Sequence, residues 1–235
     1  SPLKKKWIEG TNLVFLRELT GGIYFGEKGR KDGGNSAFDI CPYNKEEVKR
    51  LAKKGFELAM NRDKKLCCVD KANVLETSRL WRETVQEMEK DFPKVEVSYE
   101  FVDAVAMRLV QWPNSYDVLI TENLFGDILT DEASVISGSM GLMPSASIGE
   151  KNALFEPIHG SYPEVAGLNI ANPLATILSA AMMFEYSFGL NSEGETIRNA
   201  VNESLKQRII TKDLVNENER FSTTSEVGDW ISKNL

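Results

Sequence analysis

Hydrophobic positions along this chain follow two alternating spacings, one typical of strands and one typical of helices. Short apolar runs and alternating stretches predict strands at residues 13–16, 65–70, 95–101 and 116–121. Apolar residues three and four positions apart predict helices at residues 45–62, 76–91, 103–111, from 123 onward, 173–188, 193–208 and 225–235. Because strands alternate with amphipathic helices, the pattern predicts an α/β fold with much parallel pairing.

Two segments interrupt this alternation. Residues 26–44 are rich in glycine, asparagine and aspartate, and we expect a loop or a hairpin arm there. Residues 133–149 are mostly small, which predicts a close contact between helices or subunits, followed by a loop.

The run YDVLITENLFGDILTDE, residues 116–132, carries the clearest chemical signal. Asp127 and Asp131 lie four residues apart, so a helix places both carboxylates on one face, where they repel each other. No Lys or Arg lies between Val118 and Met143. Mg²⁺ or Mn²⁺ would relieve the repulsion, because these cations prefer carboxylate oxygens as ligands. The alternative is a solvated acidic helix face, which the apolar neighbours make less favourable.

Charged residues also stand where predicted strands end. Lys71, Asp103 and Asp127 each follow a different strand. Active sites in α/β folds collect at the carboxyl ends of strands. A lone lysine there is often an ordinary surface residue, but three such positions together favour a site.

Two further candidates lie in RELTGGIYFGE, residues 17–27. Tyr24 stands among glycines that allow close backbone approach. It can act as a general acid with help from a cation such as Lys71, or it can be a packed aromatic residue. Arg17 can bind a substrate carboxylate through two parallel hydrogen bonds, or form a salt bridge to Glu18 or another neighbour.

Composition narrows the class of protein. The chain has 235 residues, a formal net charge of −7 and a pI of about 5.0, so we expect no nucleic-acid surface. The longest weakly polar stretch, 173–183, is too short to span a membrane, and the basic start lacks the apolar core of a signal peptide. Three cysteines without a Cys-x-x-Cys motif predict reduced thiols and a cytoplasmic location.

Residues 156–172 have features of a nucleotide-binding loop. His159, the one histidine, precedes Gly160, and Glu164 can accept hydrogen bonds from a ribose. Neither a Gly-x-Gly-x-x-Gly nor a Walker A motif is present. The pattern alone is therefore weak, and His159 can equally be a structural residue in a turn.

Five motifs together carry a resemblance to a known family. They are RELTGGIYFGE (17–27), VDKANVLETSRLWRE (69–83), FVDA (101–104), TENLFGDILTDEAS (121–134) and FEPIHGSYPEVAGLNIANP (155–173). From end to end, the chain resembles the isocitrate/isopropylmalate family of β-decarboxylating dehydrogenases, and GGIYFG resembles its isopropylmalate branch. The resemblance implies two lobes around a mixed, largely parallel sheet. Residues 1–137 would form the central dimerisation lobe, and residues 138–235 part of the cofactor-binding lobe.

The resemblance also implies a reaction and the residues for it. The reaction is oxidation of 3-isopropylmalate by NAD⁺, followed by decarboxylation to 2-oxoisocaproate, a step of leucine biosynthesis. The implied ligands of Mg²⁺ or Mn²⁺ are Asp103, Asp127 and Asp131. Lys71 would assist removal of the hydroxyl proton, Tyr24 would protonate the enol that remains after loss of CO₂, and Arg17 and Asp103 would contact the substrate.

A single segment would hold the cofactor. The implied NAD-binding residues are Glu156, His159, Gly160, Ser161, Tyr162, Pro163, Glu164, Val165, Ala166, Gly167, Leu168, Asn169, Ile170, Ala171 and Asn172. Many relatives have Asp where this chain has Glu164, so the charge is kept and we expect NAD over NADP.

The resemblance further implies a homodimer with shared active sites. Lys71 and Asp103 would serve Tyr24, Asp127 and Asp131 of a second copy, and residues 26–44 match the position of the family's intersubunit arm. The family's N-terminal segment, which carries a glycine turn and two more substrate arginines, is absent from these 235 residues. We therefore expect that these residues alone do not turn over substrate at a normal rate. The same chemistry on homoisocitrate, tartrate or malate, and a non-catalytic subunit of this fold, are the alternatives.

Overall fold

The structure, a computed structural model, describes residues 1 and 3–235. The described chain forms two compact units, one of residues 3–136 and one of residues 137–235 together with Ser1. The lobes inferred from the sequence, 1–137 and 138–235, and the functions assigned to them stay predictions.

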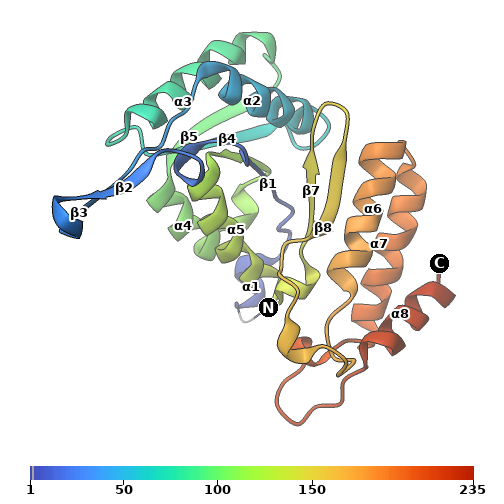
Figure 1. The fold of residues 1–235 in the computed structure, drawn as a ribbon. Helices are drawn as coiled ribbons and strands as arrows, with labels where there is room; N and C mark the ends of the chain where they lie inside the picture. Colours follow the sequence, from blue (N-terminus) through green and yellow to red (C-terminus); the bar gives the residue numbers. More distant parts are fainter. Residues whose placement is uncertain (2) are drawn as a thin grey trace. The chain divides into compact units, whose positions relative to one another are not determined.

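A parallel four-stranded sheet forms the centre of the unit of residues 3–136 (Figure 1). It consists of β1 (Val14–Arg17), β4 (Lys65–Asp70), β5 (Glu96–Phe101) and β6 (Val118–Thr121). The strands lie in the order β1-β6-β4-β5, and each neighbouring pair is parallel. This confirms the predicted α/β class, and it brings the carboxyl ends of all these strands to one edge of the sheet.

Helices cover both faces of this sheet (Figure 1). α2 (Lys45–Met60) and α3 (Glu76–Met88) pack on one face, and α4 (Val102–Gln111) and α5 (Asn123–Ser137) pack on the other. The adjacent residues Cys67 and Cys68 of β4 contribute to different faces, as expected for a strand. All three cysteines are free thiols in the part of the chain that the structure describes.

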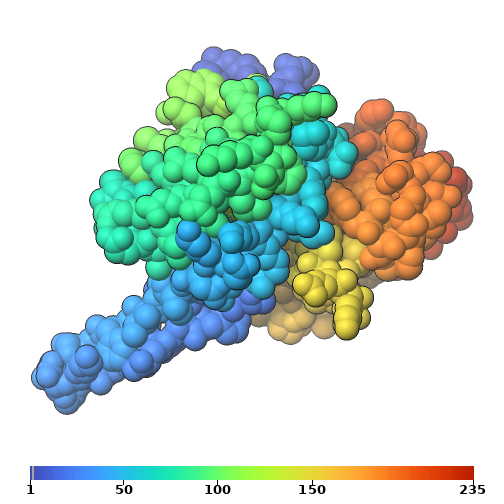
Figure 2. Space-filling model, turned by 90° about the horizontal axis from the view of Figure 1, so that it is seen from above, coloured from blue at the N-terminus to red at the C-terminus, as the bar shows by residue number. Residues whose placement is uncertain are grey.

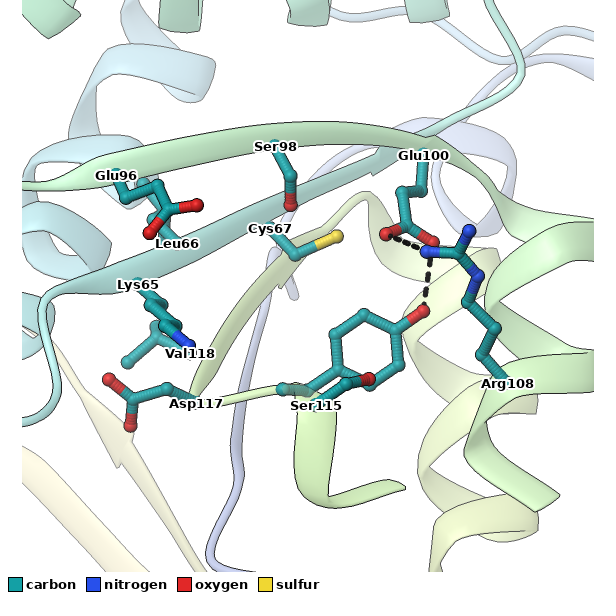
Figure 3. A pocket seen from close by; sticks show the side chains of 11 residues that line it. Lys65, Leu66, Cys67, Glu96, Ser98, Glu100, Arg108, Ser115, Asp117 and Val118 are labelled. Carbon is teal, nitrogen blue, oxygen red and sulfur yellow. Dashed lines mark hydrogen bonds and ion pairs between the residues drawn. The ribbon is translucent and has the colours of Figure 1, made fainter. Parts of the chain in front are cut away.

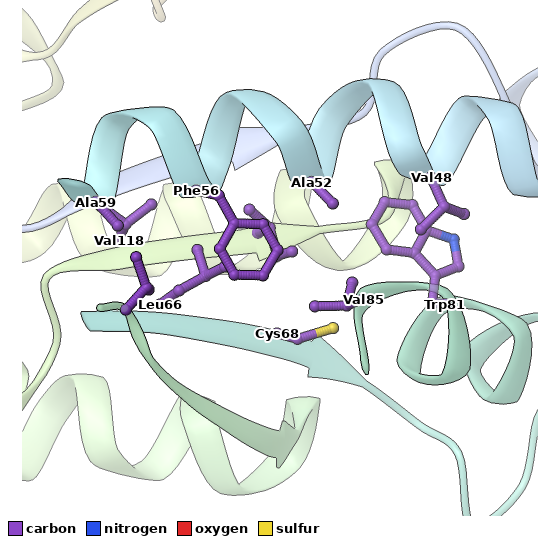
Figure 4. Packing of buried hydrophobic residues seen from close by; sticks show 11 residues of the cluster. Val48, Ala52, Phe56, Ala59, Leu66, Cys68, Trp81, Val85 and Val118 are labelled. Atoms are coloured by element: carbon purple, nitrogen blue, oxygen red, sulfur yellow. The ribbon is translucent and has the colours of Figure 1, made fainter. Parts of the chain in front are cut away.

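The core under α2 shows why the helix lies where it does (Figure 4). Val48, Ala52, Phe56 and Ala59 follow the spacing of one helix face and are fully buried. A Cβ atom on Gly55 would lie 2.6 Å from Ile120 Cγ2, so the glycine lets α2 approach β6 closely. The helix begins at a capping box in which the Asn44 side chain accepts from the Glu46 and Glu47 amides.

A hairpin arm extends from this unit (Figure 2). β2 (Lys28–Lys31) and β3 (Ser36–Asp39) pair antiparallel, with Lys28 opposite Asp39 and Lys31 opposite Ser36. The turn between them contains Gly33 and Gly34 at positive φ. The hairpin predicted within residues 26–44 is therefore confirmed.

The second unit combines a hairpin with three helices. β7 (Pro144–Ile148) and β8 (Ala153–Pro157) pair antiparallel. α6 (Leu174–Phe188), α7 (Asn191–Lys206) and α8 (Thr224–Lys233) share a core built on Leu174, Val201, Val227 and Ile231. The sequence did not predict either strand of this hairpin, and β7 lies within the small-residue segment 133–149. The sequence PSASI contains a single β-branched residue, Ile148, and its other residues are not typical of strands.

One short helix, α1 (Lys5–Ile8), precedes β1. Within residues 1 and 3–235, none of the helices combines the length and the apolar character that a membrane crossing requires.

Replacement of Phe56 by Ala should destabilise the first unit by about 3–5 kcal/mol, because a fully buried aromatic side chain is removed from the core. The Phe56 ring also stacks on Phe92, with ring centroids 4.6 Å apart. Denaturant unfolding measures the change. Lys53→Ala, on the exposed side of the same helix, is the control and should shift stability by no more than about 0.5 kcal/mol. Equal effects of the two variants would contradict the assigned packing.

Candidate active site

Asp127 is the centre of a cluster at the carboxyl ends of β1 and β6. Arg17, the last residue of β1, places Nη1 2.6 Å from Asp127 Oδ1. The Tyr24 hydroxyl donates to Asp127 Oδ2 at 2.8 Å. The Arg17 guanidinium also lies 5.4 Å from the centre of the Tyr24 ring. These three residues, the Arg17–Tyr24–Asp127 cluster, come from segments more than a hundred residues apart along the chain.

Asn123, which was not predicted as a site residue, binds Arg17 of this cluster and the turn before Tyr24 through hydrogen bonds. Its side chain is almost fully buried, with 2% exposure. Oδ1 accepts from Arg17 Nε at 3.1 Å and from Arg17 Nη2 at 2.8 Å, while Nδ2 donates to the Gly21 carbonyl at 3.0 Å. In the sequence, Asn123 indicated only the start of a helix, because its contacts lie on segments distant along the chain.

Buried polar residues fix the start of α5. Glu122 Oε1 accepts from the Phe125 amide at 2.7 Å and thereby caps the helix. The Tyr43 hydroxyl donates to Glu122 Oε2 at 3.0 Å and accepts from the Asn123 amide at 2.9 Å. Burial raises the pKa of Tyr43 above its ordinary value, so Tyr43 keeps its proton and this donation.

The glycine turn that carries Tyr24 is built around Glu18 and Tyr43. The Glu18 carboxylate is buried and accepts from the Thr20 and Gly21 amides, the latter at 2.6 Å. Gly22 has a φ of 73°, and a Cβ atom there would lie 2.7 Å from Tyr43 Cζ. Only glycine meets both conditions without strain. The turn then leads into the 3₁₀ segment Gly22–Tyr24.

A second pair lies at the carboxyl ends of β4 and β5. Lys71 follows β4, Asp103 lies in the first turn of α4, and Lys71 Nζ lies 2.5 Å from Asp103 Oδ1. The hydrogen bond from Lys71 lowers the pKa of Asp103, so this carboxylate stays ionised. The Lys71 backbone is held by a hydrogen bond from its amide to Ser78 Oγ at 2.9 Å. These residues form the Lys71–Asp103 pair.

The role of Lys71 beside Tyr24 of a second copy stays a prediction, because the structure contains a single chain. Within the chain, Lys71 binds Asp103, and Arg17 is the cation near the Tyr24 ring. The hydrogen bond to Asp127 is the main reason that the pKa of Tyr24 lies above its ordinary value. The phenol is therefore protonated at neutral pH.

The three predicted metal ligands do not converge within one chain. Asp127 and Asp131 lie one turn apart on α5, and the Asp131 side chain is exposed, whereas Asp103 belongs to the Lys71–Asp103 pair. Among the residues that the structure describes, no group of at least three His, Cys, Asp or Glu side chains is placed to hold a metal ion. Carboxylates are the donors that a hard divalent cation prefers, and Asp127 and Asp131 are the two predicted ligands that one chain brings onto the same helix.

The predicted cofactor segment is an exposed loop in the second unit. It runs from the end of β8 through the turn Pro163–Val165, where the Glu164 side chain is exposed. Tyr162, Gly167 and Asn169 adopt positive φ. The loop offers backbone groups and one carboxylate at its surface.

Side chains tie this loop to the helices that follow. Asn169 Oδ1 accepts from the Ser225 amide at 3.1 Å. Asn172 Oδ1 accepts from the Leu174 amide at 2.9 Å, as a cap for α6, and Asn172 Nδ2 donates to Asp213 at 3.0 Å. His159 Nδ1 lies 2.9 Å from the Gly160 carbonyl, while its Nε2 is buried with no hydrogen-bond partner in the described chain.

A polar cavity of about 200 Å³ lies at the other edge of the sheet, near the amino ends of the strands (Figure 3). Its central charges are paired with one another. Arg108 Nη1 lies 2.7 Å from Glu100 Oε1, and the Tyr116 hydroxyl donates to Glu100 Oε2 at 2.9 Å. Asp117 is bound by Arg62 at 2.6 Å. The ion pairs therefore leave these charged groups engaged with one another at the amino ends of the strands.

Acidic and basic side chains gather at the carboxyl edge of a parallel sheet, where α/β folds bind their ligands. The chain matches the isocitrate/isopropylmalate dehydrogenase family over residues 1–231, and it belongs to this family.

Individual relatives agree with this assignment. The 3-isopropylmalate dehydrogenase of Desulfitobacterium hafniense (strain Y51) is 53% identical over 98% of this chain and 66% of its own length. That of Bacteroides fragilis (strain YCH46) is 55% identical over 98% of this chain and 65% of its own length. The solved isocitrate dehydrogenase from Methylococcus capsulatus is 37% identical with a TM-score of 0.89, covering 95% of this chain and 67% of that one. The chain spans about two thirds of the length of the curated relatives it matches.

Replacement of Gly126 by Ala should destabilise the protein by about 1–3 kcal/mol, although alanine normally favours a helix. A Cβ atom at this position would lie 2.6 Å from Arg17 Cγ and would also meet Thr121 Oγ1. The matched control is Gly228→Ala within α8, where the added methyl meets nothing within 4 Å. This variant should stabilise its unit by roughly 0.5–1 kcal/mol. Denaturant unfolding of both variants checks the opposite signs, and stabilisation by Gly126→Ala would contradict the close packing of Arg17 on α5.

Proposed function

We propose that this protein catalyses the NAD⁺-dependent oxidative decarboxylation of 3-isopropylmalate, with Mg²⁺ or Mn²⁺, as a step of leucine biosynthesis. One observation carries the proposal. The Arg17–Tyr24–Asp127 cluster and the Lys71–Asp103 pair lie at the same sheet edge. The chain that bears them is more than half identical to curated 3-isopropylmalate dehydrogenases over 98% of its length.

Arg17 is suited to bind a substrate carboxylate. Its guanidinium is oriented by Asn123 and Asp127, and its side chain keeps 24% exposure. Part of its fixed set of N–H donors therefore remains open to a ligand. A carboxylate bound there would lie beside Asp127 and the Tyr24 hydroxyl.

Lys71 and Tyr24 would handle the protons. Lys71 would assist removal of the proton of the substrate hydroxyl, directly or through water, and the ionised Asp103 orients its side chain. Tyr24 would donate its proton to the enol carbon after loss of CO₂. Tyr24 carries the proton for this step at neutral pH, and the Arg17 guanidinium near its ring is the cation in the same chain that can assist the proton's release.

Asp127 and Asp131 of one chain, with Asp103 of a second copy, would hold the divalent metal. When bound, the metal would act as a Lewis acid for the hydroxyl and adjacent carboxylate of the substrate. Arg17 would orient Asp127 through Oδ1. The segment 156–172 would bind NAD⁺, and the exposed Glu164 carboxylate favours a free ribose over a 2′-phosphate.

A homodimer would complete each site. The two clusters lie on separate strand pairs, β1–β6 and β4–β5, so a second copy can bring Asp103 and Lys71 to the first copy's Asp127. The arm supports this arrangement, because a two-stranded ribbon with open edges is marginally stable alone and invites pairing. Apolar side chains exposed on α4 and α5 also favour a partner on that face. They are Met107, Val110 and Ile128.

A substrate panel tests the proposed reaction. The full-length protein should reduce NAD⁺ with 3-isopropylmalate and Mn²⁺ far faster than with isocitrate, homoisocitrate or tartrate, measured by NADH absorbance. Analysis of the 2-oxo acid product checks decarboxylation. Preference for another of these diacids would reject isopropylmalate as the substrate while keeping the reaction class.

Asp127→Asn should abolish metal-dependent turnover, because the variant loses a charged ligand and the acceptor that organises Arg17 and Tyr24. We expect a fall of at least roughly 100-fold in kcat at saturating Mn²⁺, the scale seen when a single electrostatic group is removed. Asp63→Asn is the control, since Asp63 is exposed and precedes β4 at the opposite edge. Unchanged turnover in Asp127→Asn would reject the assigned site.

A further inference from the structure

We propose that Asn123 is a positioning residue for the reaction. Its buried side-chain amide fixes the position of the substrate-binding Arg17 and of the turn that carries the catalytic Tyr24. The inference rests on the proposed function, because it assigns roles to Arg17 and Tyr24. It adds a residue that contacts neither substrate nor metal in that mechanism.

The oxygen of the amide controls Arg17. Asn123 Oδ1 accepts hydrogen bonds from Nε and Nη2 of Arg17, at 3.1 and 2.8 Å. Asp127 holds the remaining Nη1 nitrogen at 2.6 Å. With both ends of the fork engaged, the guanidinium cannot rotate freely. The aliphatic part of Arg17 passes over Gly126, where there is no side chain to displace it.

The nitrogen of the same amide controls the glycine turn. Asn123 Nδ2 donates to the Gly21 carbonyl at 3.0 Å. From Gly21 the chain enters the Gly22–Tyr24 segment, and the Tyr24 hydroxyl reaches Asp127 Oδ2. The turn is also closed by hydrogen bonds from the Gly22 amide to Pro42 O and from the Gly26 amide to Gly22 O. Asn123 thus links this turn to α5 through its side chain, in addition to the Tyr24–Asp127 hydrogen bond.

The backbone of Asn123 is itself held in place. Its amide donates to the Tyr43 hydroxyl at 2.9 Å, and Tyr43 is bound to the buried Glu122. The Asn123 side chain is 2% exposed, and both its oxygen and its nitrogen are hydrogen-bonded. It has one favourable orientation, because a flipped amide would turn its NH₂ group toward the N–H groups of Arg17 and its oxygen toward the Gly21 carbonyl. The Asn123 side chain therefore keeps Arg17 and the Gly21 carbonyl in fixed positions relative to α5.

Asparagine is the residue type that meets both demands at this position. Aspartate keeps an acceptor for Arg17 but turns a second oxygen toward the Gly21 carbonyl. Alanine loses both contacts and leaves the buried Gly21 carbonyl without its side-chain donor. These two substitutions separate the acceptor role from the donor role.

The test uses Asn123→Asp and Asn123→Ala in the full-length protein, assayed with isopropylmalate, NAD⁺ and saturating Mn²⁺. Both variants should lower kcat, by up to roughly 100-fold, because the Tyr24 turn loses its donor and a small misplacement of a reacting group is costly. The KM for isopropylmalate should rise about 10-fold in Asn123→Ala, the scale of one lost binding contact. It should stay near the wild-type value in Asn123→Asp, which still orients Arg17. The KM for NAD⁺ should not change in either.

Amide hydrogen exchange provides a readout that does not depend on the substrate. Exchange in residues 20–26 should become faster in both variants, while exchange in β4 and β5 stays as in the wild type. The matched control is Asp117→Asn, which removes a buried carboxylate bound to Arg62 at the opposite end of β6. It should lower the free energy of unfolding. Exchange in residues 20–26 should stay as in the wild type, and the variant should not show the fall in kcat with unchanged KM that is expected of Asn123→Asp.

The outcomes distinguish the two proposals. Unchanged exchange in residues 20–26 of both Asn123 variants, or the same kinetic and exchange changes in Asp117→Asn, would overturn the positioning role and leave the proposed function standing. A wild-type protein that does not turn over isopropylmalate would overturn the proposed substrate. Faster exchange confined to residues 20–26 would still support the link between Asn123 and the turn.

Discussion

Parallel pairing in the order β1-β6-β4-β5 is the constraint on which the candidate site depends. Arg17 pairs opposite Thr121, so the end of β1 lies beside the start of α5. Asp70 pairs opposite Phe101, so Lys71 and α4 begin side by side. Antiparallel pairing of either couple would send one of these ends to the other edge of the sheet, and the ion pairs Arg17–Asp127 and Lys71–Asp103 would be lost.

Buried polar groups then convert this rough proximity into a defined geometry. Glu18, Glu122 and Asn123 are each less than one tenth exposed, and each is bonded to backbone amides or carbonyls near the carboxyl edge. Because an unsatisfied buried group is costly, such a network has few alternative arrangements. The same network explains the glycines around it. Gly22 and Gly126 leave room for Tyr43 and Arg17, respectively.

Charge is distributed over the site in two parts. Asp127 is neutralised by Arg17, and Asp103 by Lys71, so each chain presents two compensated clusters and an additional exposed carboxylate on Asp131. In the proposed dimer, the two clusters would belong to different copies of the chain at each site. This distribution of charge explains why the pKa of Tyr24 is raised in the single chain, where the phenol donates to a carboxylate.

The sequence by itself determined the α/β class, most of the helices, the hairpin arm and the residues that stand at strand ends. Those features depend on local spacing and on which strand a residue follows, and both can be read along the chain. The resemblance to the family followed from motifs between residues 17 and 173, and the family match extends over residues 1–231.

Only the tertiary structure decided which of these residues meet. Nothing near Asn123 in the sequence indicates Arg17 or Gly21, since each contact joins segments about a hundred residues apart. Likewise, the spacing of Asp127 and Asp131 does not reveal that Arg17 relieves the repulsion between them. β7 also escaped prediction, because Ser and Ala in its sequence have weak local preferences and the strand forms through pairing with β8. Pairing order and burial are properties of the folded chain, and they select one partner for each polar group.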